Sequence, residues 1–199
     1  MRYIAFEGVD GAGKTTVAGR VADALRHDGF DVVMVREPGG TPIGEAVRQI
    51  LLEAGESMVP RTEALLFAAA RTQLAAEVIE PALARGSFVL SDRTVYSSLA
   101  YQGGGRNLGV ESVREPNVWG LGKVWPDLVI WLDVDPETGL FREDGADRIS
   151  NEGPALMQAV AGAYRALSES EPERIHRIDA GQDLDRVVAD CLAVIEAAS

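Results

Sequence analysis

The chain of 199 residues has little sulfur and little imidazole, with one cysteine and two histidines. A single cysteine excludes an intrachain disulfide. Cys191 shares a predicted helical face with Val188 and Ile195, which favours a buried, inert thiol over a nucleophile. His27 and His176 do not show the spacing of a metal site.

Basic residues are also scarce, since 19 Lys and Arg face 31 Asp and Glu and leave a net charge of −12. This balance argues against a broad nucleic-acid-binding surface but allows a small anionic ligand where a few arginines converge. No apolar stretch approaches the ~20 residues that a membrane helix needs, and the N-terminus lacks the pattern of a signal peptide. We therefore expect a cytoplasmic protein with neither a nucleic acid nor a membrane as partner.

Apolar runs typical of strands alternate with helical patterns along the whole chain. The expected strands are 3–7, 31–36, 87–91, 128–133 and 175–179, and the expected helices are 14–28, 43–53, 62–84, 155–169 and 183–197. This alternation predicts a single α/β domain over residues 1–199, a three-layer fold with a five-stranded parallel sheet and helices on both faces. Two segments are expected to be mobile, the glycine-rich 103–106 and a short polar lid at approximately 137–154. Ligands of such sheets bind beyond the carboxyl ends of the strands.

A phosphate-binding motif, G-x-x-x-x-G-K-T, follows the first expected strand directly. Its glycines let backbone N–H groups turn inward around an anion, Lys14 can reach the β- and γ-phosphates, and the Thr15 hydroxyl can bind Mg²⁺. A flexible turn with an unrelated lysine is the alternative, but the strand before the motif and the helix after it, with Val17, Val21 and Leu25 on one face, favour nucleotide binding. The predicted nucleotide-binding residues are Gly8, Val9, Asp10, Gly11, Ala12, Gly13, Lys14, Thr15 and Thr16.

Further motifs accompany this loop in a fixed order. They are Arg36-Glu37-Pro38-Gly39-Gly40-Thr41, Leu66-Phe67-Ala68-Ala69-Ala70-Arg71, Ser91-Asp92-Arg93, Ser97-Ser98-Leu99-Ala100-Tyr101-Gln102-Gly103, Pro126-Asp127-Leu128 and Ile178-Asp179-Ala180. In this order and spacing the chain resembles the bacterial thymidylate kinases, a P-loop nucleoside monophosphate kinase family, from Ile4 to the C-terminal helix. The resemblance implies phosphorylation of dTMP to dTDP with ATP and Mg²⁺, in a homodimer.

Three residues match the family positions that hold the thymine. Phe67 and Arg71 lie four apart on a predicted helix and share one face, so that a ring can stack on a pyrimidine while a guanidinium donates to a ring carbonyl. The amide of Gln102 offers a donor and an acceptor, which suits N3–H and the neighbouring carbonyl. Without the resemblance, Phe67 is better explained as a core residue and Arg71 as a solvated charge.

Five more side chains are expected around the acceptor nucleotide. By similarity Arg48 binds the base or acceptor pocket, although a solvated charge is its simplest alternative. Ser98 can hydrogen-bond the base edge, and Tyr101 can press against the sugar, with core packing nearly as favoured. Asp10 and Glu37 are the carboxylates expected nearest the sugar and the waters of the metal.

Asp92 and Arg93 end the third expected strand. A carboxylate at the end of an apolar strand is costly to bury unless it is paired, and we expect Asp92 to face Mg²⁺ together with Thr15. Arg93 can bind the acceptor phosphate through two parallel hydrogen bonds. The alternative is that Asp92 and Arg93 both pair with other charges at the sheet edge.

Lid arginines, Arg142 or Arg148, are expected to supply positive charge at the phosphates.

The chain departs from the family pattern in three places: at Thr94, in the lid, which is shorter than usual and carries Glu143, Asp144 and Asp147, and at Arg114-Glu115-Pro116. Gly11 stands where some relatives have an arginine, and for this reason the catalytic charge is assigned to the lid. Thr94 replaces the usual tyrosine, which affects local packing near the acceptor. Pro116 interrupts an expected helix, so we expect that helix to begin late, with Pro116 in its first turn.

The resemblance predicts a reaction without a general base, because the attacking phosphate oxygen of dTMP is already anionic. Two other functions remain open from the sequence. A related kinase could act on dUMP or dCMP, although Gln102 and Arg71 suit cytosine poorly, and a pocket for one methyl group is worth only ~1 kcal/mol. A nucleotide-dependent switch protein is less favoured, because no N-K-x-D element of guanine-specific switches is present.

Overall fold

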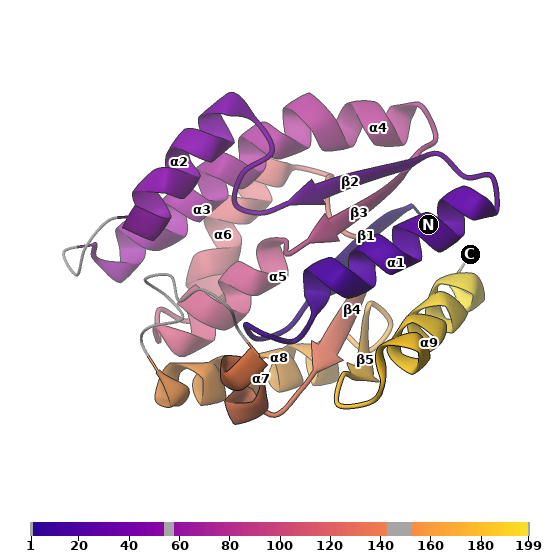
Figure 1. The fold of residues 1–199 in the computed structure, drawn as a ribbon. Coiled ribbons are helices and arrows are strands. Elements are labelled where there is room, and N and C mark those ends of the chain that lie inside the picture. The colour runs from indigo at the N-terminus through magenta and orange to yellow at the C-terminus, as the bar shows by residue number, and fades with distance from the viewer. Residues whose placement is uncertain (1, 54–57, 143–152, 199) are drawn as a thin grey trace.

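The computed structural model describes residues 2–53, 58–142 and 153–198. A five-stranded parallel sheet lies at its centre, with the strand order β2-β3-β1-β4-β5 (Figure 1). The strands are β1 (Tyr3–Glu7), β2 (Val32–Arg36), β3 (Phe88–Asp92), β4 (Leu128–Asp133) and β5 (Ile175–Asp179). The predicted α/β fold is confirmed. Three strands have the expected bounds, and β2 and β3 begin one residue later than expected.

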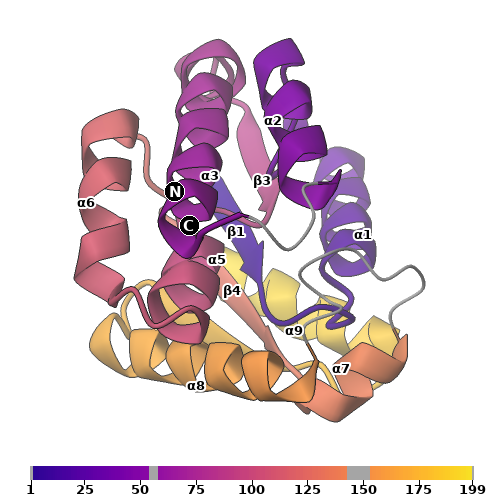
Figure 2. The same cartoon turned by 90° about the vertical axis from the view of Figure 1, so that its left-hand side faces the viewer.

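Helices cover both faces of the sheet, with α1 and α9 on one side and α3, α5 and α6 on the other (Figure 2). Two segments are π-helical, η1 (Ala75–Ile79) and η2 (Leu99–Gly105). The α-helices are α1 (Lys14–His27), α2 (Pro42–Glu53), α3 (Pro60–Leu74), α4 (Glu80–Ala84), α5 (Val95–Ser98), α6 (Val110–Leu121), α7 (Pro136–Arg142), α8 (Pro154–Ser170) and α9 (Leu184–Ala197). The expected long helix 62–84 is therefore α3, η1 and α4 in succession.

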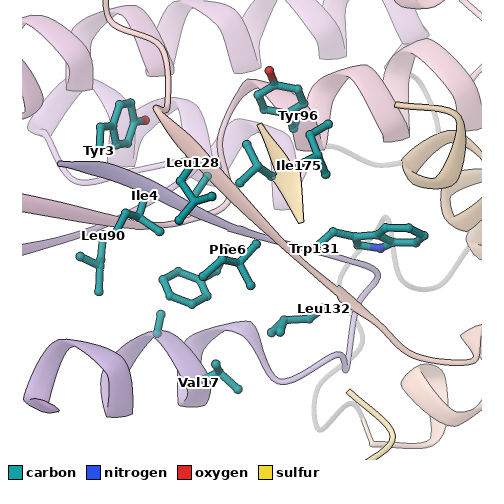
Figure 3. Packing of buried hydrophobic residues seen from close by; sticks show 14 of the residues in the cluster. Tyr3, Ile4, Phe6, Val17, Leu90, Tyr96, Leu128, Trp131, Leu132 and Ile175 are labelled. Carbon is teal, nitrogen blue, oxygen red and sulfur yellow. The ribbon is translucent and has the colours of Figure 1, made fainter. Parts of the chain in front are cut away.

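The core is formed where alternate strand residues meet these helices. Figure 3 shows Phe6 and Leu132 on the side of the sheet where Val17 of α1 lies. On the opposite face, Trp131 stacks on Tyr164 of α8 with ring centroids 6.2 Å apart. Strands buried on both faces explain why the sequence shows continuous apolar runs instead of alternation.

Two sequence-based expectations about helices hold. Val17, Val21 and Leu25 are all buried on one face of α1, as their spacing predicts. Cys191 is a buried free cysteine in α9, and burial raises the pKa of its thiol to about 12. Within the described parts of the chain, no helix has both the length and the apolarity of a membrane span.

The expectation for Pro116 is wrong. Pro116 lies inside α6, which begins at Val110, instead of in a first turn. The next residue explains how the helix continues: Asn117 is buried, its Nδ2 donates to the Val113 carbonyl at 2.8 Å, and its Oδ1 accepts from Arg71 at 2.6 Å. One hydrogen bond within α6 and one from Arg71 of α3 thus anchor the turn in which proline removes a backbone donor.

The expectation of a mobile segment at 103–106 is also wrong. Gly103, Gly104 and Gly105 belong to η2, and Arg106 pairs with a buried carboxylate. A Cβ on Gly105 would lie 2.7 Å from Leu156, and one on Gly104 would collide with Ala163, both in α8. These two glycines permit close packing of helices rather than flexibility.

Candidate active site

One cavity of about 1080 Å³ lies at the carboxyl edge of the sheet and holds most of the predicted site residues. Its volume is at the upper end of the range for small-molecule sites. The predicted residues that line it are Asp10, Gly11, Ala12, Gly13, Lys14, Thr15, Thr16, Glu37, Arg48, Phe67, Asp92, Arg93, Ser98, Tyr101, Gln102 and Arg142. Gly8, Val9 and Arg71 are not part of this lining, and Arg148 lies outside the described residues.

The phosphate loop connects β1 to α1. Gly13 precedes the helix with a φ of 85°, a left-handed conformation that glycine adopts without strain. Lys14 is buried, and its Nζ donates to the carbonyls of Gly8 at 3.1 Å and Val9 at 2.8 Å. Burial, and next the Arg93 cation, lower the pKa of Lys14 to about 8. An anionic ligand in the loop would favour the charged form of this lysine.

The first part of the expected lid is α7, which packs directly on the phosphate loop. Gly139 of α7 lies against Gly11, and a Cβ on Gly139 would come within 2.5 Å of the Asp10 carbonyl. A side chain at position 11 would collide with the Gly139 backbone. This contact explains why an arginine at position 11 does not fit here. Arg142, at the end of α7, lines the cavity, and its Nη1 donates to the Ala180 carbonyl at 3.2 Å.

Thr15 and Asp92 meet at the start of α1, where the Thr15 hydroxyl donates to the Asp92 carboxylate. A hydroxyl and a carboxylate oxygen are the ligands that Mg²⁺ prefers, together with water and phosphate oxygens. The pair therefore fits the metal that the motif implies. Among the described residues, no cluster of three or more His, Cys, Asp or Glu could hold a metal by itself.

Arg93 lies between the phosphate loop and η2. Its guanidinium forms an ion pair with Asp10, donates to Ser97 Oγ at 3.2 Å and faces the Tyr101 ring, whose centroid is 5.1 Å from Cζ. Its backbone is left-handed, with a φ of 71°, which is uncommon for a residue with a side chain. Such a conformation needs strong support from its surroundings.

Glu7 supplies that support. This buried carboxylate accepts from the Thr94 amide and the Thr94 hydroxyl, both at 2.7 Å, from Ser97 Oγ at 2.6 Å and from Tyr164 Oη at 2.7 Å. These bonds fix the segment that follows Arg93. They also give the Thr94 side chain a role, because its small hydroxyl reaches the Glu7 carboxylate.

Arg71 lies behind the cavity wall and is almost completely buried. Its Nε donates to Glu37 at 2.6 Å and its Nη1 to Asn117 at 2.6 Å, while Nη2 donates to Ser98 Oγ and the Thr94 carbonyl, both at 3.1 Å. These bonds occupy four of the five N–H donors of a guanidinium. The predicted hydrogen bond to a ring carbonyl would use the remaining Nη1–H.

Glu37 has one buried oxygen, Oε1, for which the described part of the chain offers no hydrogen-bond partner. Burial raises the pKa of Glu37 to about 7, against the opposing effect of Arg71. An unpaired buried acceptor is costly, and a hydroxyl of a ligand would satisfy it. Glu37 lines the cavity, consistent with its expected place beside the acceptor sugar.

The end of the cavity assigned to the base contains Phe67, Ser98 and Gln102. Phe67 is half-buried against the core and lines the cavity, whereas Gln102 is 2% exposed. Gln102 Nε2 donates to Glu63 Oε1 at 2.8 Å. Arg48 also lines the cavity, and its Nη1 donates to the Pro38 carbonyl at 3.0 Å. The individual roles of these residues stay predictions.

Several residues of the site were missed by sequence reasoning. Glu63 of α3 and Asn117 of α6 hold the predicted site residues Gln102 and Arg71, and Glu7 of β1 holds the segment that follows Arg93. Gln182 and Leu184, beside the start of α9, line the opposite end of the cavity. Glu7 is a charged residue within the apolar segment that forms β1. Because a buried carboxylate needs partners, the sequence could have indicated that Glu7 takes part in a hydrogen-bond network. Asn117 gave no such signal.

A phosphate-binding loop on a parallel sheet, with an arginine-lined second compartment in the same cavity, defines a P-loop nucleotide-binding protein that can hold two anionic ligands together. The model of the thymidylate kinase family matches residues 6–191. The chain belongs to this family.

Individual relatives agree over nearly their whole length. A thymidylate kinase from Alkalilimnicola ehrlichii is 48% identical over 192 residues, which cover 94% of this chain and 88% of the relative. One from Latilactobacillus sakei is 45% identical and covers 100% of this chain and 96% of the relative. The crystal structure of thymidylate kinase from Ehrlichia chaffeensis superposes with a TM-score of 0.82 at 29% identity and covers 98% of both chains.

Proposed function

We propose that this member of the thymidylate kinase family transfers the γ-phosphoryl group of ATP to dTMP with the help of Mg²⁺. Conversion of dTMP to dTDP is the activity of the family to which the chain belongs. The donor, the metal and the residue roles are our inference from the site. One observation carries it: the phosphate loop and the compartment with Phe67 and Gln102 are parts of a single cavity.

In this proposal the loop residues 8–16 and Lys14 bind the phosphates of ATP, and the helix dipole of α1 adds positive potential. Adenine occupies the end near Gln182 and Leu184, which line the same cavity. Thr15 and Asp92 would hold Mg²⁺, which would supply charge neutralisation at the donor phosphates.

The acceptor nucleotide occupies the other half. Phe67 stacks on thymine, Gln102 and Arg71 hydrogen-bond its edge, and Ser98 and Arg48 complete the pocket. The orphan oxygen of Glu37 accepts from the sugar, and Tyr101 packs beside it. Arg93 gives up part of its ion pair with Asp10 and donates to the phosphate of dTMP instead.

Transfer is a single in-line displacement. A phosphate oxygen of dTMP forms a bond to the γ-phosphorus, and the bond from that phosphorus to the bridging oxygen of ADP breaks. The second pKa of a phosphate monoester is near 6, so the attacking oxygen is anionic at neutral pH and no general base is needed. Lys14, Arg93 and Arg142 neutralise the charge that moves to the leaving group.

The polar stretch at approximately 137–154 acts as the lid in this proposal and excludes water during transfer. Its first part, α7, already contacts the phosphate loop through Gly139. Because of this contact, a movement of the phosphate loop on ATP binding would also move α7 and, with it, Arg142 at the end of this short helix.

We also propose a cytoplasmic homodimer that forms through α6. Two apolar side chains of this helix are exposed, Val118 at 50% and Trp119 at 89%. Exposed aromatic side chains of this size are typical of protein interfaces. Sedimentation equilibrium of the wild-type chain and of Trp119→Glu tests the assignment, with loss of the dimer in the variant as the expected result.

The function is tested by a coupled assay of ADP release with ATP and Mg²⁺, using dTMP, dUMP, dCMP, dGMP or no acceptor. We expect fast turnover with dTMP, slower turnover with dUMP and almost none otherwise. Lys14→Met protein, prepared in parallel, controls for contaminating kinases. Turnover that is independent of any monophosphate would instead favour a nucleotide-dependent switch protein, and equal turnover with dUMP would favour a less selective pyrimidine kinase.

A further inference from the structure

Glu63 is a buried carboxylate that the proposed reaction does not use. It lies in the first turn of α3, is 1% exposed, and is not part of the cavity lining. Its Oε1 accepts from Gln102 Nε2 at 2.8 Å, and both of its oxygens accept from the Arg106 guanidinium, at 3.2 Å and 3.0 Å. A buried charge of this kind is stable only when it is paired, and Arg106 provides the counter-charge.

Because a carboxylate paired with arginine only accepts hydrogen bonds, it determines which way the Gln102 amide points. The NH₂ group must face Glu63, since the alternative orientation would place two oxygens against each other. The carbonyl oxygen, Oε1, is then the acceptor that Gln102 has available for the cavity that it lines. No described residue donates to this oxygen.

The two pyrimidines present opposite patterns to such an amide. Thymine has a donor at N3 beside a carbonyl acceptor, whereas cytosine has an acceptor at N3 beside an amino donor. An amide that can rotate by 180° about its terminal bond satisfies either base. An amide held in one orientation satisfies one of them and places like groups against the other, which costs a large factor in a buried site.

We propose that Glu63 is a positioning residue for base selection: by fixing the Gln102 amide, it restricts the acceptor pocket to pyrimidines that carry a hydrogen on N3. Arg106 supports this role by donating to both oxygens of the Glu63 carboxylate. The proposal rests on the proposed function, because it assumes that the base of the acceptor faces Gln102. Selection between thymine and cytosine is thereby assigned to a residue that does not contact the base.

The test is the ratio of kcat/KM for dTMP to that for dCMP in the wild type and in Glu63→Gln. The variant preserves shape, but its amide can donate as well as accept, so the Gln102 amide is free to turn. We expect the ratio to fall at least tenfold, mainly because kcat/KM for dCMP rises. Glu171→Gln is the matched control, because Glu171 is a half-buried carboxylate with arginine and tyrosine partners outside the cavity.

A ratio that stays within twofold of the wild type in Glu63→Gln, with both substrates slowed equally, would overturn the proposal and leave Glu63 a purely structural residue. Wild-type protein that shows no preference for dTMP would instead reject the proposed function before any variant is compared. The two failures are therefore distinct.

A second measurement does not depend on the Glu63→Gln variant. In ¹⁵N-resolved NMR spectra of the wild type, the side-chain amide of Gln102 is identified by its disappearance in Gln102→Leu. We expect one of its two protons to be shifted downfield and protected from exchange, both in the free protein and with dTMP bound. Two protons that exchange rapidly in the free protein would contradict a fixed amide.

Discussion

The two halves of the cavity are built in different ways. The donor half consists mainly of one continuous segment, in which backbone groups and Lys14 surround the space for the phosphates. The acceptor half consists of side chains from distant parts of the chain, joined in hydrogen-bond networks. Arg71 of α3, for example, donates hydrogen bonds to three separate parts of the chain. These are Glu37, which follows β2, Asn117 of α6 and Ser98 of α5.

This difference indicates how each half obtains its selectivity. A backbone cradle recognises a shape that every nucleoside triphosphate shares, and one lysine supplies its charge. A buried side-chain network can hold a donor or an acceptor in one orientation, and so distinguish closely related bases. Changes in the donor half should therefore alter the rate, whereas changes in the acceptor half should alter stability and substrate choice.

The largest effect is expected for Lys14→Met. Loss of this charge should lower kcat/KM at least ~10³-fold, because the variant cannot neutralise the transferring phosphates. The dissociation constant for dTMP, measured by titration calorimetry, should stay within about twofold of the wild type. A large loss of dTMP affinity would show that the two halves are not separable in this way.

Arg142→Ala should lower kcat by a factor on the order of 10–100, with a smaller change in KM, because the charge is needed mainly in the transition state. Steady-state kinetics with ATP and dTMP measure this. Arg186→Ala, which removes an exposed arginine of α9 outside the cavity lining, is the matched control. Unchanged turnover in Arg142→Ala would remove α7 from the mechanism.

Arg71→Lys tests the acceptor network. Lysine keeps the charge but cannot reach Glu37, Asn117 and Ser98 together, so buried acceptors lose their donors. We expect a loss of about 2–4 kcal/mol in the free energy of unfolding and a several-fold rise in KM for dTMP. Arg85→Lys, at an exposed arginine that ends α4, should change stability by less than ~0.5 kcal/mol. Similar losses in both variants would contradict a special role for the network.

The smallest expected effect is the pH dependence of stability and ATP binding that the Lys14 pKa causes. Its pKa of about 8 in the folded protein lies below the ordinary 10.5, so this lysine lowers stability below pH 8, and the penalty disappears as the pH rises toward 10.5. The phosphates of bound ATP favour the charged form of Lys14, so ATP binding at pH 8.5 should take up protons. At the same pH, kcat/KM for ATP should be about fourfold lower than its plateau value at lower pH. Calorimetry in buffers of different ionisation enthalpy measures the uptake. Equal uptake in Lys14→Met would assign it to another group.

The sequence indicated the phosphate loop more directly than the contacts that hold the acceptor half, for a physical reason. Residues 8–16 are contiguous, and the glycines that a phosphate-binding loop needs occur there at fixed spacing. The Glu63–Gln102 and Arg71–Asn117 contacts join residues 39 and 46 positions apart, and such pairs leave no local pattern. Three glycines at 103–105 suggested mobility, yet Gly104 and Gly105 pack on α8 and Gly103 lies against Val110 of α6.

The most direct test of the central claim follows the phosphoryl group itself. ATP labelled with ³²P in the γ-position is incubated with the enzyme, Mg²⁺ and dTMP, and the products are separated. Direct transfer between the two halves of one cavity predicts that the label appears in dTDP, with one ADP formed for each dTDP and little inorganic phosphate. Label released as inorganic phosphate at the same rate with and without dTMP would contradict it.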